Sequence, residues 1–109
     1  MIKRGSIIIV SLSGDYGKPR PALVVQAAPY LKLASVVVCP LTTTIPAEQS
    51  DLRLVVEPSA DNGLRERSAI MIDKISAIPV QRIGGVIGQA NDVLMSDVDT
   101  ALAIFLRLG

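Results

Sequence analysis

The residues with the clearest capacity for chemistry lie in residues 14–21, whose sequence is GDYGKPRP. Two glycines allow a tight path and close approach of a ligand, and the prolines on both sides of Arg20 restrict the backbone there. A guanidinium held in this way matches a phosphate bidentately, Lys18 adds a second positive charge, and Tyr16 offers a surface for base stacking. The segment therefore predicts a loop that holds the backbone of an RNA strand. A hairpin loop whose arginine pairs with a nearby carboxylate is the alternative.

Two further segments carry groups that could act on a phosphate. Residues 41–44 (LTTT) follow an apolar run, and their hydroxyl groups can donate hydrogen bonds to phosphate or ribose oxygens. Residues 68–74 (SAIMIDK) end an apolar run with Asp73 and Lys74. Threonines at a strand end and a charged pair at a solvated strand end are also common without any site, so neither segment predicts one by itself.

The composition limits what kind of protein this is. A chain of 109 residues, half of them hydrophobic, predicts one domain that spans residues 1–109 and buries one core. The absence of histidine removes the commonest metal ligand and the commonest general base near neutral pH. Cys39 is the single cysteine, so a disulfide within the chain and a cysteine-rich metal site are excluded. With no run of about 18 apolar residues and no signal-peptide pattern, we expect a cytoplasmic protein without a cofactor.

The elements that must position these groups are mostly strands. Short β-branched runs broken by glycine, proline, aspartate and serine indicate a small sheet or barrel. Residues 7–10 (IIIV) and 36–38 (VVV) are apolar at consecutive positions, so we expect both faces of these strands to be covered. The predicted strands are residues 6–12, 22–27, 35–40, 52–56, 69–73 and 85–89.

The chain is predicted to end in a helix over residues 96–108, capped by Ser96. Apolar side chains occur on more than one side of this helix. Such a helix can form a subunit interface or can close a barrel, and the pattern favours neither. A short helical turn is predicted at residues 79–82, with Pro79 in its first turn.

Taken in order, the motifs resemble those of a known family, the MazF/PemK (Kid) toxins of bacterial toxin-antitoxin pairs. The resemblance covers nearly the whole chain and rests on five short motifs: Arg4-Gly5, residues 20–25 (RPALVV), residues 39–42 (CPLT), residues 68–75 (SAIMIDKI) and Ile87-Gly88. It implies a mainly β fold, a small SH3-like barrel of about six to seven strands with a C-terminal helix, and a homodimer. It also implies a metal-independent endoribonuclease that cuts mostly single-stranded RNA at short sequences and is held inactive by a cognate antitoxin protein.

The resemblance implies that Arg20 and Thr42 are catalytic. The chemistry would be attack of a ribose 2′-hydroxyl on the adjacent phosphorus, which leaves a 2′,3′-cyclic phosphate and a 5′-hydroxyl. Arg20 would stabilise the phosphorane charge and Thr42 would position the phosphate or relay a proton. Asp73 is the predicted proton acceptor because histidine is absent. The predicted RNA-binding residues are Tyr16, Lys18, Ser68 and Lys74.

The sequence departs from the family at positions that matter for the chemistry. Some members carry an arginine where Met71 stands and a histidine in the first loop, near Asp15 or Tyr16. The proton donor is therefore unassigned. Others have glutamine in place of Lys74, so the RNA sequence that is cut does not transfer from relatives.

Two other functions share this fold expectation. CcdB-type toxins have the same barrel, bind DNA gyrase and catalyse nothing. A catalytically inactive relative that binds only its antitoxin or operator is the third reading. A preformed phosphate site at Arg20 and Thr42 favours RNA cleavage, because a gyrase inhibitor has no need of one.

Overall fold

The computed structural model describes residues 2–11, 18–48 and 50–109. In chain order its elements are β1 (Ser6–Ser11), β2 (Pro19–Val24), the 3-10 turn η1 (Ala28–Tyr30), β3 (Ser35–Thr42), β4 (Arg53–Val56), β5 (Ser68–Met71), η2 (Ile72–Lys74), β6 (Ser76–Pro79), η3 (Val80–Arg82), β7 (Ile83–Gln89) and the helix α1 (Asp92–Leu106). The mainly β fold with a C-terminal helix is as predicted. No helix within the described ranges is long and apolar enough to cross a membrane.

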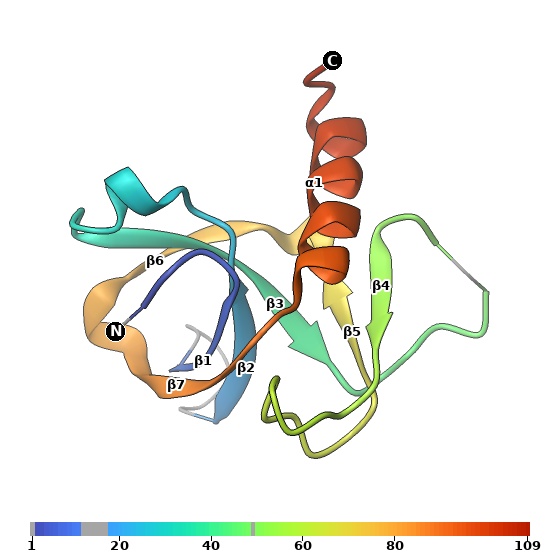
Figure 1. Cartoon of the computed structure of the whole chain (residues 1–109), viewed down its shortest axis with the longest axis horizontal. Coiled ribbons are helices and arrows are strands. Elements are labelled where there is room, and N and C mark those ends of the chain that lie inside the picture. The colour runs from blue at the N-terminus through green and yellow to red at the C-terminus, as the bar shows by residue number, and fades with distance from the viewer. Residues whose placement is uncertain (1, 12–17, 49) are drawn as a thin grey trace.

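The seven strands form one antiparallel, strongly curved sheet (Figure 1). The strand order is β4-β5-β3-β2-β1-β7, and β6 pairs with the first half of β3. The long strand β3 therefore contacts β6, then β2, then β5 along its length. In the described part of the chain β4 and β7 are the two ends of this order, so the barrel-like sheet is not closed.

The sheet has a core on each of its faces, as the runs of consecutive apolar residues predicted. Ile7, Leu23, Cys39 and Leu41 belong to one buried cluster, which α1 covers with Val98, Ala101 and Leu102. The second cluster comprises Ile8, Val10, Ala22, Val24, Val36, Val38 and Ile78. Alternate residues of β1 and β3 thus enter different cores because neighbouring side chains of a strand point to opposite faces.

The helix α1 begins four residues before the predicted start at Ser96. Its N-cap is Asn91, whose side chain accepts a hydrogen bond from the Leu94 backbone N–H at 2.8 Å. The predicted start rested on Ser96 as the cap, but asparagine is as good a cap as serine, and the first turn contains the exposed Val93. The helix ends at Arg107, which has a left-handed backbone (φ 57°). Its last turn carries the exposed side chains of Ile104, Phe105 and Leu106.

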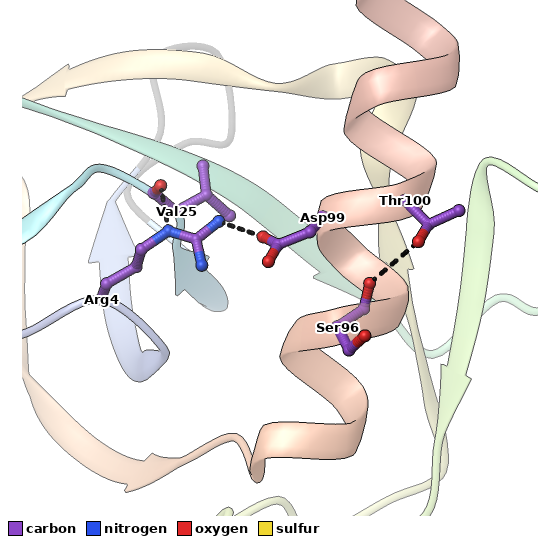
Figure 2. Close-up of polar contacts among 5 residues, drawn as sticks. All are labelled: Arg4, Val25, Ser96, Asp99 and Thr100. Carbon is purple, nitrogen blue, oxygen red and sulfur yellow. Dashed lines mark hydrogen bonds and ion pairs between the residues drawn. The ribbon is translucent and has the colours of Figure 1, made fainter. Parts of the chain in front are cut away.

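Arg4 fastens the helix to the sheet (Figure 2). Its Nε donates to the Val25 carbonyl at 2.9 Å, and a terminal nitrogen meets the Asp99 carboxylate at 2.6 Å. The first residues of the chain and the middle of α1 are joined by one side chain. The Arg4-Gly5 motif therefore has a structural role.

Other element bounds differ from the predictions in ways that bear on the site. The second strand begins at Pro19, three residues earlier than predicted, and β3 extends two residues further, to Thr42. The predicted strand over residues 69–73 ends at Met71, where the chain turns into η2. The strand β6 was not predicted. The predicted helical turn near Pro79 is present as η3, and Pro79 is the N-cap residue of η3.

Candidate active site

Arg20 and Thr42 lie on two neighbouring strands at the same end of the sheet. Ala22 pairs with Pro40 in the antiparallel ladder between β2 and β3. The ladder ends at this pair, and Arg20 and Thr42 lie two residues beyond it on their own strands, where both line one pocket. The sheet itself, rather than a loop, therefore brings the two predicted catalytic residues together.

The prolines around Arg20 are compatible with this strand position. Pro19 and Pro21 pair with Ser11 and Ile9 of β1, and the ladder to β3 starts only at Ala22. A proline is tolerated where one side of a strand has no ladder hydrogen bonds to make. The restricted proline backbones hold Arg20 within the strand, at an exposed position.

A small pocket of about 140 Å³ opens between these strand ends. Arg20, Lys18, Thr42 and Ser68 line it, and Thr43 completes its polar wall. None of the described residues that line it is acidic. Two positive charges beside hydroxyl groups, in a space of this size, suit a phosphate group.

The Thr42 hydroxyl is oriented by its own backbone. Its oxygen accepts a hydrogen bond from the Thr44 N–H at 3.1 Å. A hydroxyl can accept one hydrogen bond and still donate its proton, so the Thr42 O–H can donate to a phosphate oxygen. Ser68 differs, because its hydroxyl already donates to the Glu66 carbonyl at 2.9 Å and its side chain is buried.

Asp73 does not line this pocket. It lies in η2, beyond the end of β5, and its two carboxylate oxygens accept hydrogen bonds from Arg53 at 2.9 and 3.0 Å. These bonds hold the pKa of Asp73 below its usual value, with the nearby charges of Arg53 and Lys74 acting in the same direction. The structure thus gives the carboxylate a partner on β4, and its predicted role in proton transfer stays a prediction.

The remaining predicted residues are dispersed. Lys74 lines a separate pocket of about 530 Å³, together with Ser76 and Arg82. Tyr16 and residues 12–17 as a whole lie outside the described residues, so the predicted stacking surface has no structural test. Within the described ranges no three potential ligands among cysteine, aspartate and glutamate are close enough to hold a metal ion.

Cys39 is not available as a catalytic group. It is fully buried, and burial raises its pKa to about 11. The thiol is therefore protonated at neutral pH and has no access to a ligand.

Sequence reasoning missed a second recess beside the pocket. The connection between β4 and β5 brings Arg65 and Glu66 to a cavity of about 440 Å³ that shares Thr43 and Ser68 with the smaller pocket. The Asn62-Gly63 pair indicates a turn in this connection. The sequence alone does not indicate which strand that turn contacts.

Comparisons with known proteins agree on one family. Residues 3–106 match the family described as PemK-like, MazF-like toxin of type II toxin-antitoxin system. The chain is 36% identical over 109 residues to a protein of Mycolicibacterium smegmatis named "Probable endoribonuclease MazF", with 99% of each chain covered.

Solved structures are similar over the same length. One is an endoribonuclease in complex with its cognate antitoxin from Mycobacterial species, with a TM-score of 0.84, 25% identity and coverage of 100% of this chain and 98% of that one. Another is the Mycobacterium tuberculosis toxin MazF-mt6, with a TM-score of 0.78, 28% identity and coverage of 95% and 98%.

Proposed function

The chain belongs to the PemK-like, MazF-like toxins of type II toxin-antitoxin systems, and we propose that it is an endoribonuclease that cuts single-stranded RNA in the Arg20–Thr42 pocket. The observation that carries the proposal is that Arg20 of β2 and Thr42 of β3 meet in one pocket, where the two strands lie side by side. Both residues line a pocket whose size and charge suit one phosphate group.

The proposed reaction is a phosphoryl transfer within the RNA, with one proton removed and one proton delivered. The 2′-oxygen of a ribose attacks the adjacent phosphorus, and the bond between phosphorus and the 5′-oxygen of the next nucleotide breaks. The 2′-hydroxyl proton goes to an acceptor, and the departing 5′-oxygen takes up a proton. The products are a 2′,3′-cyclic phosphate and a 5′-hydroxyl.

Arg20 and Thr42 supply the electrostatic part of this reaction. Negative charge on the non-bridging oxygens grows as the phosphorane forms, and donors already fixed in place stabilise it more in the transition state than in the substrate. The Arg20 guanidinium carries several N–H donors in one plane, while the Thr42 O–H donates from an oxygen held by the Thr44 N–H. Lys18 adds positive charge at the same pocket.

The family relationship also supports proposals about assembly. We propose that the protein forms a homodimer in which the exposed apolar end of α1 takes part, and that a cognate antitoxin protein binds and inhibits it. A cytoplasmic location and a single domain over residues 1–109 complete the proposal. One similar solved structure contains a cognate antitoxin, which supports the antitoxin as partner.

The direct test is RNA cleavage in excess chelator. We expect end-labelled single-stranded RNA to be cut, with fragments that carry a 5′-hydroxyl and a 2′,3′-cyclic phosphate. Arg67→Ala is a matched control for Arg20→Ala, because Arg67 is exposed, pairs with Glu57 at 2.7 Å and does not line the pocket. Intact RNA together with stalled DNA gyrase would instead identify an inhibitor of the CcdB type.

A further inference from the structure

The recess beside the catalytic pocket has the features of a binding site for a flat, partly polar group. Pro21, Thr43 and Ser68 line both spaces, so the two are neighbours. The catalytic pocket is too small for a nucleotide, whereas the recess, at about 440 Å³, lies in the range of about 300–1,000 Å³ that is usual for ligand pockets. A chain bound with one phosphate in the first space has room for a neighbouring group in the second.

The walls of the recess are apolar and its rim is charged. Ile9 of β1, Ile87 of β7 and Leu64 provide the apolar surface, and Arg65 and Glu66 stand at the rim. In the described part of the chain neither of these two side chains forms an ion pair. Both are exposed. A guanidinium and a carboxylate side by side can donate to and accept from the edge of one nucleobase.

The loop that carries Arg65 and Glu66 is held rigidly. The buried side chain of Asn62 accepts hydrogen bonds from the backbone N–H groups of Ser59 and Leu64, both at 3.0 Å. Its amide nitrogen donates to the Glu57 carbonyl at 2.9 Å. One side chain therefore closes the loop upon itself, and a ligand that binds there has less loop ordering to bring about.

Close backbone contact also fixes the loop against β7. Gly63 has a left-handed backbone (φ 69°), and a Cβ at this position would lie 2.0 Å from the Ile87 carbonyl oxygen. A Cβ on Gly88 would lie 2.2 Å from the carbonyl carbon of Asn62. The Gln89 N–H donates to the Asp61 carbonyl at 2.8 Å. The two segments thus meet where only glycine fits, directly beside Ile87 in the recess wall.

We propose that this recess receives the nucleobase next to the scissile phosphate, and that Arg65 and Glu66 determine which base is accepted there. The inference rests on the proposed function, since it needs RNA in the Arg20–Thr42 pocket. It assigns sequence discrimination at one position of the cut site to a loop that contains neither Arg20 nor Thr42.

The test is the cleavage profile of a single-stranded RNA pool that is random around one fixed region. Fragment ends are sequenced for the wild type, Arg65→Ala, Glu66→Gln and the control Glu57→Gln. Glu57 lies in the same connection, is exposed and does not line the recess. Thermal midpoints of all variants are measured alongside to show that they fold.

We expect Arg65→Ala and Glu66→Gln to lose the wild-type preference at one position beside the cut, by about 5- to 100-fold, the range given by one good base contact. Preferences at the other positions and the profile of Glu57→Gln should be unchanged. If the wild type cuts RNA and both variants keep its full profile, the inference fails and the proposed function stands. If the wild type cuts no RNA, both fail.

Discussion

Replacing Asn62 with alanine tests the view that one side chain shapes the connection between β4 and β5. The Asn62 side chain is 6% exposed and makes three hydrogen bonds to backbone groups of its own loop. Alanine removes all three. The N–H groups of Ser59 and Leu64 lose their acceptor, and the Glu57 carbonyl loses a donor.

The expected loss of stability follows from these three bonds. Each contributes about 1 kcal/mol net, so their sum is about 3 kcal/mol, and unsatisfied buried groups add to it. Since a domain of this size has a free energy of unfolding of about 5–15 kcal/mol, the loss is a large fraction. At about 4 °C per kcal/mol, the thermal midpoint should fall by roughly 12 °C.

The assay is thermal unfolding followed by circular dichroism, with Asn91→Ala as the matched control. Asn91 is exposed and its side chain makes one capping bond, to the Leu94 N–H. Loss of such a cap costs about 1 kcal/mol, or roughly 4 °C. If Asn62→Ala lowers the midpoint no more than Asn91→Ala does, the loop is not held by Asn62 and the rigidity inferred for the recess is refuted.

Three further predictions concern the catalytic groups. Arg20→Ala should lower kcat by about 10²- to 10³-fold, the usual effect of losing one transition-state donor, with the fold retained; a melted protein would show that Arg20 acts in stability. Thr42→Val removes the hydroxyl and keeps the shape, so we expect a large loss of kcat with little change in KM, whereas unchanged kinetics would remove Thr42 from the mechanism. Asp73→Asn and Arg53→Ala break the same ion pair, but only the first removes the carboxylate. Because both break the Arg53–Asp73 pair, we expect each variant to lose about 0.2–1 kcal/mol of stability, while the role predicted for Asp73 as proton acceptor requires that only Asp73→Asn lose cleavage. The contribution of Asp73 to stability is present above its unfolded-state pKa and is lost as the pH falls through its lower folded-state pKa, so denaturation at acid pH should be less steep in Asp73→Asn. A loss of cleavage in Asp73→Asn alone would establish Asp73 as the proton acceptor.

The sequence predicted the mainly β fold with its C-terminal helix through patterns that are local. The consecutive apolar residues of β1 and β3 require cover on both faces, and the structure has a core on each. Arg20 and Thr42 were identified by their residue types and by resemblance, and both line the same pocket.

What the sequence did not give depends on contacts between distant segments. The contact of Asp73 with Arg53, twenty residues earlier, crosses the β4–β5 pair and was not predicted; the role of Asp73 as proton acceptor stays a prediction. The recess needs β1, β7 and the β4–β5 connection together. Its position follows from the approach of Gly63 to Ile87, which no single stretch of sequence encodes.

The contact between the β4–β5 connection and β7 also determines when this part of the protein can fold during synthesis. The ribosome makes residues 57–67 before β7. Until β7 has been made, Gly63 has no strand to pack against. The β1–β7 ladder likewise joins Ser6 to Gln89 and cannot form before Gln89 has been made. Pairings this remote in sequence form slowly because a long loop must close first. The recess therefore cannot form until β7 has been synthesised.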